Sequence, residues 1–274
     1  MVAFAGNSIL NRLALLDGAI APGQFAVIRV VTGVLVLVAL LVLRDRVLPR
    51  PARPDVVAVA GLTVYMLGFS FAYLSMDAGL GALVLFGGVQ ITMFAGALLE
   101  GEKPPLQRWA GMVLAVLGLA VLTIPSGPVA VAPSALMLMS LAALGWGIYS
   151  LAGRRARDPI AATGWNFLYC LPFVALAWLL LPDATEASPT GIFLAMLSGG
   201  VTSALGYALW YSLLPELGAT KGALAQLSVP AIALVLGALF LGETIAMAAL
   251  VAAAMILGGI AVGLVQFRTP AGRG

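Results

Sequence analysis

The sequence predicts an all-α integral membrane protein with ten transmembrane helices, arranged as two inverted five-helix repeats. Three observations lead to this fold class. Hydrophobic residues make up 62% of the 274 residues and charged residues only 9%, whereas soluble domains carry about 25% charged residues. Apolar stretches of membrane-spanning length recur along the whole chain, and the second half repeats a pattern found in the first.

Ten apolar stretches are separated by charged or proline-rich segments. A membrane-spanning helix needs roughly 20 apolar residues, and the stretches near this length are 1–16, 24–43, 56–75, 79–99, 106–124, 133–152, 160–181, 190–213, 220–241 and 244–266. The first stretch lacks a basic leader, so we expect no cleaved signal peptide. Little of the chain lies outside these stretches, and we expect no separate soluble domain.

The basic residues predict the orientation of the helices. If both termini are cytoplasmic, the outer loops contain no lysine or arginine, while the inner loops and the C-terminal tail contain Arg44, Arg46, Arg50, Arg53, Lys103, Arg108, Arg154, Arg155, Arg157, Lys221, Arg268 and Arg273. This distribution satisfies the positive-inside rule. The net charge of +3 therefore reflects membrane orientation, and we expect a bacterial plasma (inner) membrane location and no nucleic-acid partner.

The chain contains an internal duplication. The segment "GALVLFGGVQITMFAGALLEGE" (81–102) aligns with "GALAQLSVPAIALVLGALFLGE" (222–243), matching at Gly-Ala-Leu, Ile, Gly-Ala-Leu and Gly-Glu. We therefore divide the chain into a first five-helix repeat, 1–128, and a second, 129–274. An odd number of spans inverts the second copy relative to the first, an arrangement in which carriers place a midplane site at the repeat interface.

These features resemble an EamA-type member of the drug/metabolite transporter superfamily. The resemblance rests on the paired "LLEGE" and "LFLGE" endings, on Arg29 in "FAVIRVV" and on "LGWGIY" in the sixth span. Trp146, Tyr207 and Trp210 further resemble the YddG branch, whose members export aromatic and other amino acids. One departure is that the ninth span has Pro230 in "LSVPAI", whereas the fourth reads "FGGVQI", so the fourth helix is expected to be straighter or to bend at its glycine pair.

Aromatic residues form stripes in the third and eighth spans, which are equivalent helices of the two repeats. Tyr65, Phe69 and Tyr73 recur every four residues, and Tyr207 and Trp210 begin a similar stripe. Such stripes serve helix packing or the membrane interface, but hydroxyls in the middle of a span need hydrogen-bond partners. We predict an aromatic-walled cavity for a small amphipathic solute, with these substrate-binding residues: Asn7, Asn11, Tyr65, Phe69, Phe86, Gln90, Trp146, Tyr149, Trp165, Tyr207, Trp210, Tyr211, Gln226 and Ser228.

Several polar residues occur within the apolar spans. Asn7 and Asn11 share one helix face, and they either line the outer part of the cavity or form hydrogen bonds between helices. Arg12 lies near the outer end of its span, where we expect it to reach the interface or to pair with Asp17. Arg29 lies deeper; it either pairs with an outer-loop carboxylate or faces a substrate carboxylate, and we favour the structural pair.

Acidic residues are missing from the middle third of every span, and the chain has no histidine. The acidic relay typical of proton-coupled pumps is therefore absent, and any coupling must use carboxylates nearer the helix ends, such as Glu100, Glu102 or Glu243. The Gly-Glu pairs have a structural interpretation too, in which the glycine ends a helix and the carboxylate caps the next one. No metal-site or hydrolase motif occurs, so we expect no cofactor, no metal and no enzymatic activity.

The fifth and tenth spans are rich in glycine and nearly free of polar residues. Their small residues, Gly111, Gly118, Gly258, Gly259 and Gly263, are typical of close helix packing within the chain or at a dimer interface. We therefore expect a monomer or a possible homodimer.

The expected function is alternating-access export of small organic metabolites, most of all amino acids including aromatic ones. The partners are then the lipid bilayer and a small-molecule substrate. Three alternatives stay open: export of nucleobases or cationic drugs, a facilitator channel, and a non-transporting partner subunit.

Overall fold

The computed structural model describes residues 1–16, 18–47, 53–99, 101, 103–121, 132–153, 156–181, 183–213, 226 and 228–264. Within these residues the chain is helical and contains no strand. The predicted repeat boundary at 128/129, the start of the ninth predicted span, Asp17, Glu100 and Glu102 all lie outside the described residues.

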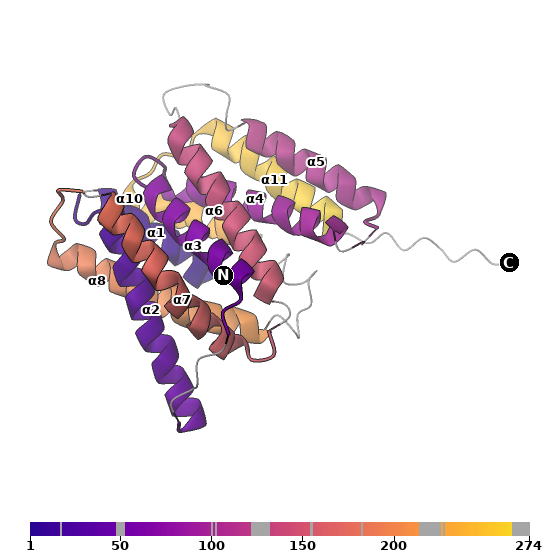
Figure 1. The fold of residues 1–274 in the computed structure, drawn as a ribbon. Coiled ribbons are helices and arrows are strands. Elements are labelled where there is room, and N and C mark those ends of the chain that lie inside the picture. The colour runs from indigo at the N-terminus through magenta and orange to yellow at the C-terminus, as the bar shows by residue number, and fades with distance from the viewer. Residues whose placement is uncertain are drawn as a thin grey trace.

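The helices follow the order expected from the apolar stretches (Figure 1). The first repeat contains α1 (Val2–Leu16), α2 (Pro22–Asp45), α3 (Val56–Ala72), α4 (Ala78–Leu99) and α5 (Leu106–Val121). The second contains α6 (Pro133–Gly153), α7 (Pro159–Leu180), α8 (Pro189–Leu197) with its continuation η1 (Ser198–Leu205), α10 (Ser228–Leu241) and α11 (Met247–Leu264). The eighth span is thus one helical run, Pro189–Leu213, with a π-helical middle.

By length and hydropathy, five of these helical runs suffice to cross a membrane: Pro22–Asp45, Ala78–Gly96, Pro133–Gly153, Pro159–Leu180 and Pro189–Leu213. The other five are shorter apolar helices packed among them. The predicted fold class, an all-helical membrane protein of ten helices in two five-helix units, is confirmed.

Local sequence explains where several helices begin and end. Proline stands at the start of α2, α7 and α8, where its missing N–H costs no hydrogen bond. The carboxylates of Asp55 and Asp158 accept backbone N–H groups in the first turns of α3 and α7, as N-cap residues do. Gly101 and Gly242 follow α4 and α10 with φ of 85° and 65°, and the left-handed conformation is one that glycine adopts freely. The predicted helix-ending role of these glycines is confirmed.

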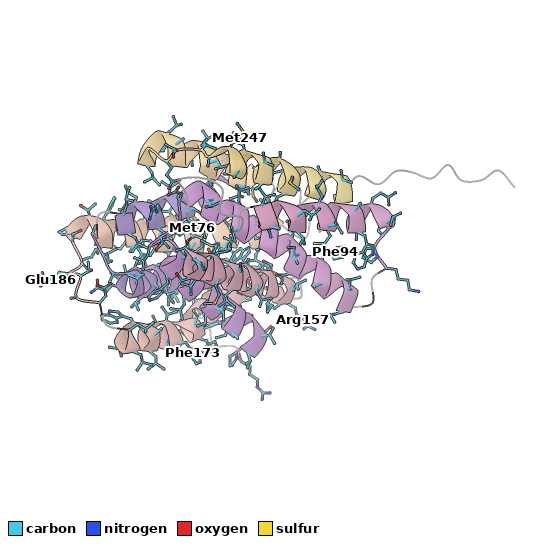
Figure 2. The ribbon with its side chains drawn as sticks, turned by 90° about the horizontal axis from the view of Figure 1, so that it is seen from above. Met76, Phe94, Arg157, Phe173, Glu186 and Met247 are labelled. Atoms are coloured by element: carbon cyan, nitrogen blue, oxygen red, sulfur yellow. The ribbon has the colours of Figure 1, made fainter. Side chains whose placement is uncertain are left out.

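The contacts between helices obey the symmetry of the duplication. α2 packs on α7, α4 on α10 and α5 on α11, so these three helices each contact their own counterpart in the other repeat. The contact of α3 with α6 has its equivalent in the contact of α1 with α8 and η1. Figures 1 and 2 both show α5 and α11 side by side at one edge of the bundle. The two repeats therefore face each other across the centre of the molecule.

Glycines allow the closest helix crossings. A Cβ added to Gly259 would lie 2.5 Å from the carbonyl oxygen of Gly111, so α5 and α11 touch through their backbones. The same holds for α3 and α6, where a Cβ on Gly145 would lie 2.5 Å from the carbonyl oxygen of Gly61. Gly111 and Gly259, two of the small residues predicted to mediate packing, thus join α5 to α11 within one chain, whereas a Cβ on Gly258 would meet no atom within 4 Å.

The fourth and ninth spans differ less than the proline pattern predicts. α4 is one uninterrupted α-helix through Gly87 and Gly88. Pro230 lies in the first turn of α10, where proline is compatible with the helix.

The π-helical segment η1 brings polar residues to the centre of the bundle. It contains Ser198, Thr202 and Ser203, all buried. A Cβ on Gly199 would collide with the carbonyl oxygen of Arg29, so only glycine lets η1 approach α2 this closely. π-helical turns often occur at functional sites, and this one lies against the only charged side chain that is fully buried among the described residues.

Candidate functional site

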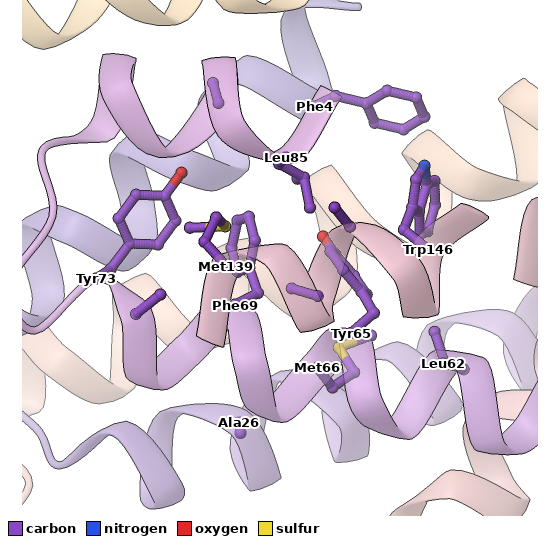
Figure 3. Close-up of a cluster of buried hydrophobic side chains, with 14 of the residues drawn as sticks. Phe4, Ala26, Leu62, Tyr65, Met66, Phe69, Tyr73, Leu85, Met139 and Trp146 are labelled. Carbon is purple, nitrogen blue, oxygen red and sulfur yellow. The ribbon is translucent and has the colours of Figure 1, made fainter. Parts of the chain in front are cut away.

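A small chamber lies where the two repeats meet. Both repeats contribute to its wall, which consists of Phe4, Asn7, Tyr65, Phe69, Leu85, Phe86, Trp146 and Tyr207. Figure 3 shows several of these side chains converging from neighbouring helices, among them Phe4, Tyr65, Leu85 and Trp146. The free volume is about 10 Å³, enough for about one water molecule. In this conformation the chamber is closed by its own side chains.

Two ring pairs in the chamber are equivalent in the two repeats. Phe4 meets Tyr207 edge-on with ring centroids 5.8 Å apart, and Trp146 meets Tyr65 at 4.9 Å. Each pair joins the two repeats. Tyr65 and Tyr207 are 142 residues apart, as are Phe4 and Trp146, within one residue of the 141-residue offset between the aligned segments. The aromatic wall is therefore formed by two positions of the first repeat and by their counterparts in the second.

Arg29 is fully buried beside this wall and contacts hydroxyl groups. Its Nε donates to Ser203 Oγ at 2.9 Å, and its Nη2 donates to the hydroxyls of Tyr65 and Tyr207, each at 3.0 Å. The two hydroxyls also bond to each other at 3.0 Å. The guanidinium carbon lies 5.3 Å from the Tyr65 ring centroid and 5.0 Å from that of Phe69, within cation–π range.

The structural ion pair favoured for Arg29 is wrong within the described part of the chain, where no carboxylate forms a salt bridge with it. The carboxylates of Asp77 and Glu243 lie instead at a helix end, where Arg12 contacts both. Arg29 is left with neutral partners.

Asn7 joins α1 to η1 at the edge of the chamber. Its Oδ1 accepts from Ser198 Oγ at 2.5 Å and from Thr202 Oγ1 at 3.0 Å, and its Nδ2 lies 3.4 Å from the Tyr65 hydroxyl. Asn7 therefore combines the two roles considered for it, because it lines the chamber and bonds across helices. Asn11 is buried and lies outside the chamber wall, and its amide has no partner among the described residues.

One end of the bundle, which we call the Arg12 end, is closed by polar contacts around Arg12. Its Nη1 donates to the carbonyl oxygens of Tyr73 and Leu74 at 2.9 and 3.3 Å. Its Nη2 lies 3.5 Å from Asp77 Oδ1 and its Nε 3.9 Å from Glu243 Oε1. These five residues form the Arg12 cluster. The predicted ion pair of Arg12 exists, with Asp77 as its partner; the predicted partner Asp17 lies outside the described residues.

Glu243 links the two repeats within the Arg12 cluster. Its carboxylate accepts the backbone N–H groups of Ala78 and Gly79, at 2.7 and 3.3 Å, at the start of α4. Helix N-termini favour negative charge, yet burial dominates and raises the pKa of Glu243. Glu243 thus caps a helix, but that helix is α4 of the other repeat, and the prediction that it caps the next helix along the chain is wrong.

The opposite end, the Arg44 end, is hollow. A cavity of about 440 Å³ opens there, lined by Arg44, Asp45, Arg53, Asp55, Ala58, Ala152, Gly153, Ala156, Arg157, Asp158, Ala161, Ala162, Trp165 and Asn166. Arg44 bonds to both carboxylate oxygens of Asp158, at 3.0 and 2.6 Å, which holds the pKa of Asp158 below its ordinary value. The rim carries both signs of charge, and the cavity reaches Asn166, the neighbour of Phe167, whose ring contacts Tyr207.

The predicted binding residues occupy different places. Six of them line the chamber: Asn7, Tyr65, Phe69, Phe86, Trp146 and Tyr207. Trp210 lies behind the wall against Phe4, and Tyr149 and Tyr211 form a pair next to Trp146. The others lie elsewhere: Trp165 at the Arg44-end cavity, Asn11 and Gln226 buried, Gln90 half-buried and Ser228 exposed.

Sequence reasoning missed Phe4, Leu85 and the hydroxyl group of Ser203. Phe4 is the only aromatic residue of α1 and lies one turn before Asn7. This position on the same part of the helix could have predicted that it lines the chamber with Asn7. Ser203 lies in the run of small residues "SGGVTS". Hydropathy does not predict a π-helical turn there, so the sequence did not show which helix face carries Ser203.

Comparison with known proteins relates this chain to transporters. The family model described as "EamA-like transporter family" matches residues 1–124 and 133–265. The "Probable amino-acid metabolite efflux pump" of Salmonella typhimurium is 30% identical over 227 residues, covering 76% of this chain and 76% of that protein. "Uncharacterized protein PA1977" of Pseudomonas aeruginosa is 46% identical over 262 residues, covering 96% of this chain and 91% of that protein.

A solved crystal structure has the same fold. It superimposes with a TM-score of 0.68 at 21% sequence identity, covering 96% of this chain and 95% of the other. The likeness therefore extends over nearly the whole chain.

Proposed function

Since this chain belongs to the EamA-like transporter family, we propose that it exports amino-acid metabolites, aromatic amino acids among them, by alternating access. It is an integral membrane transporter and not an enzyme. The relative from Salmonella typhimurium, named as an amino-acid metabolite efflux pump, supports the substrate class.

The observation that carries the proposal is the chamber shared by the two repeats. Its wall combines rings that fit an apolar or aromatic side chain with amide and hydroxyl groups that fit polar backbone atoms of an amino acid. Carriers built from inverted repeats hold their substrate at such an interface. The chamber is closed in this conformation, so a substrate enters only when the helices around it separate.

The unequal ends of the bundle support alternating access. The Arg12 end is closed by hydrogen bonds and ion pairs from three segments, whereas the Arg44 end contains a cavity of about 440 Å³. We propose that the Arg44 end faces the cytoplasm, so that the described conformation is closed to the outside and partly open to the inside. Opening of the Arg12 cluster would then release the substrate.

The proposed orientation places both termini in the cytoplasm of a bacterial cell, with the protein in the inner membrane. The arginines that line the hollow end in the described part of the chain, Arg44, Arg53 and Arg157, then face the cytoplasm, as the positive-inside rule requires. A C-terminal fusion to a reporter active only in the cytoplasm should be active. Activity of a periplasm-specific reporter instead would reverse the orientation.

Transport by purified protein in liposomes tests the function directly. We expect saturable uptake of radiolabelled phenylalanine and its acceleration by unlabelled phenylalanine on the opposite side, since counterflow requires a carrier with alternating access. A panel of amino acids, purines and quaternary amines defines the substrate class. Transport of purines or quaternary amines without amino acids would refute amino-acid export, and linear, non-saturating flux would indicate a channel.

A further inference from the structure

We propose that Arg29, together with the hydroxyls of Tyr65 and Tyr207, binds the carboxylate of the transported solute and so selects acids over amines. This inference rests on the proposed export function, and it adds the charge of the group that the chamber recognises. The inference places the carboxylate end of the substrate next to Arg29.

The hydrogen bonds around Arg29 leave donors in excess. Arg29 Nη1 has no hydrogen-bond partner among the described residues, although the side chain is fully buried. The two tyrosine hydroxyls carry two protons, of which one is used in the bond between them. In the other hydrogen bonds at these hydroxyls, the oxygen accepts from Arg29 Nη2 or from Asn7 Nδ2. A ligand at this place must therefore supply acceptors.

A second unpartnered donor belongs to a side chain of the same chamber wall. Trp146 lines the wall, and its Nε1 is buried without a hydrogen-bond partner among the described residues. Its ring lies 4.9 Å from that of Tyr65 and 4.7 Å from that of Tyr207, so it belongs to the same group of side chains. Buried donors in folded proteins are normally paired, and two of them in one cluster indicate an absent acceptor.

The charge of the cluster favours an anion. A buried guanidinium without a carboxylate is costly, because the charge has lost its hydration. The Tyr65 and Phe69 rings offset this cost only in part, through cation–π contact. A carboxylate supplies both the missing charge and two oxygens that match the planar guanidinium. Phosphate shares this chemistry but is bulkier, and the relatives point to amino acids.

Arg29 is held in place before any ligand arrives. Its Nε is fixed by Ser203, and its backbone packs directly against Gly199 of η1. No carboxylate among the described residues lines the chamber to hold an ammonium group, and the acceptor oxygen of Asn7 is already used by Ser198 and Thr202. Arg29, beside the wall, thus supplies a fixed positive charge, and the described wall offers no counter-charge for a cation.

The test uses four compounds that share one ring and differ in charge: phenylalanine, phenylalaninamide, phenethylamine and 3-phenylpropionate. In liposomes with the wild-type protein, the two carboxylates should inhibit phenylalanine counterflow about tenfold more strongly than the two amines, as expected when a charge-assisted hydrogen bond is lost. In Arg29→Gln this preference should vanish, and in Arg29→Lys part of it should remain. Arg108→Gln on α5, away from the chamber, is the control and should keep the wild-type ratio.

The outcomes separate this inference from the proposed function. Equal inhibition by acids and amines in the wild type would overturn the role of Arg29 while leaving amino-acid export intact. No transport or inhibition by any of the four would overturn amino-acid export, and the inference with it. If Arg29→Gln does not fold, the wild type and three other variants, Arg29→Lys, Tyr65→Phe and Tyr207→Phe, still decide the question. A wild-type ratio of acid inhibition to amine inhibition in all three variants would refute carboxylate binding.

Discussion

The carboxylate of Glu243 caps α4 from the other repeat, accepting the backbone N–H of Ala78 at 2.7 Å although the two residues lie 165 positions apart. Arg12 of α1 approaches the same carboxylate and also contacts Asp77. One end of the bundle is therefore held together by a single charged cluster built from α1, from the turn before α4 and from the turn after α10. Loss of any charge of this cluster should destabilise the closed conformation of that end.

Neutralising Glu243 should remove a pH dependence of stability. Burial raises the pKa of Glu243 above its ordinary value of 4.5. Just above pH 4.5 the folded protein therefore binds a proton that the unfolded chain has released, so the free energy of unfolding falls as the pH rises through this window. Glu243→Gln should lack this slope when the unfolding midpoint of the purified protein is measured between pH 4.5 and 7.

Asp183 provides the control for this experiment. Hydrogen bonds from Thr185 lower the pKa of Asp183 below its ordinary value of 3.8, so this carboxyl group titrates below the measured window. Asp183→Asn should keep the wild-type slope. The other ionisable groups facing Glu243, Asp77 and Arg12, stay in place in both variants. A slope unchanged by Glu243→Gln would show that Glu243 does not cause it.

Removing Arg12 should open the Arg12 end. Arg12→Ala leaves the carbonyl oxygens of Tyr73 and Leu74 without their donor and releases Asp77, which destabilises the closed conformation. Labelling of Asn11→Cys by a membrane-impermeant maleimide added outside, in a Cys170→Ala background, should become about tenfold faster, as loss of charged hydrogen bonds predicts. Arg108→Ala should leave the rate unchanged. Equal rates with and without Arg12 would show that this cluster is not a gate.

Most of the fold could be predicted from the sequence, because each helix is an apolar stretch ended by charged or helix-breaking residues. The predicted third span, 56–75, corresponds to α3, Val56–Ala72, and the predicted sixth, 133–152, to α6, Pro133–Gly153. Hydropathy determines such segments directly. The duplication likewise follows from matching residues, and the paired helix contacts agree with it.

The candidate site was predictable only in part. The stripes at Tyr65 and Tyr207 identified the faces that meet in the chamber, because a period of about four residues determines a helix face. The partners of Arg29 could not be predicted, since they depend on how η1 packs against α2. The π-helical turn changes the register of the eighth span and so determines that Ser203 meets Arg29.

Alanine at Gly259 should destabilise the pair of α5 and α11. The added Cβ would lie 2.5 Å from the carbonyl oxygen of Gly111 and 2.9 Å from the backbone nitrogen of Ala115, and neither backbone atom can move without separating the helices. We expect a loss of about 1–3 kcal/mol, the usual cost of overpacking, measured as a lower unfolding midpoint and a lower membrane abundance. Gly258→Ala is the matched control, because a Cβ there has no atom within 4 Å. Equal effects of the two substitutions would contradict the close crossing.

Trp146 and Trp210 should differ in their effect on substrate choice. Trp146 lines the chamber, whereas Trp210 lies outside its wall and contacts it through Phe4, with ring centroids 5.9 Å apart. A ring that touches the substrate contributes about 0.5–1.5 kcal/mol beyond its burial. Trp146→Ala should therefore reduce transport of phenylalanine relative to threonine about two- to tenfold, with transport normalised to membrane abundance. Trp210→Ala should reduce both substrates alike, because it disturbs the support of the wall and touches neither solute. The reverse ranking would place the substrate's ring on the Trp210 side of Phe4 and move the binding site away from the chamber described here.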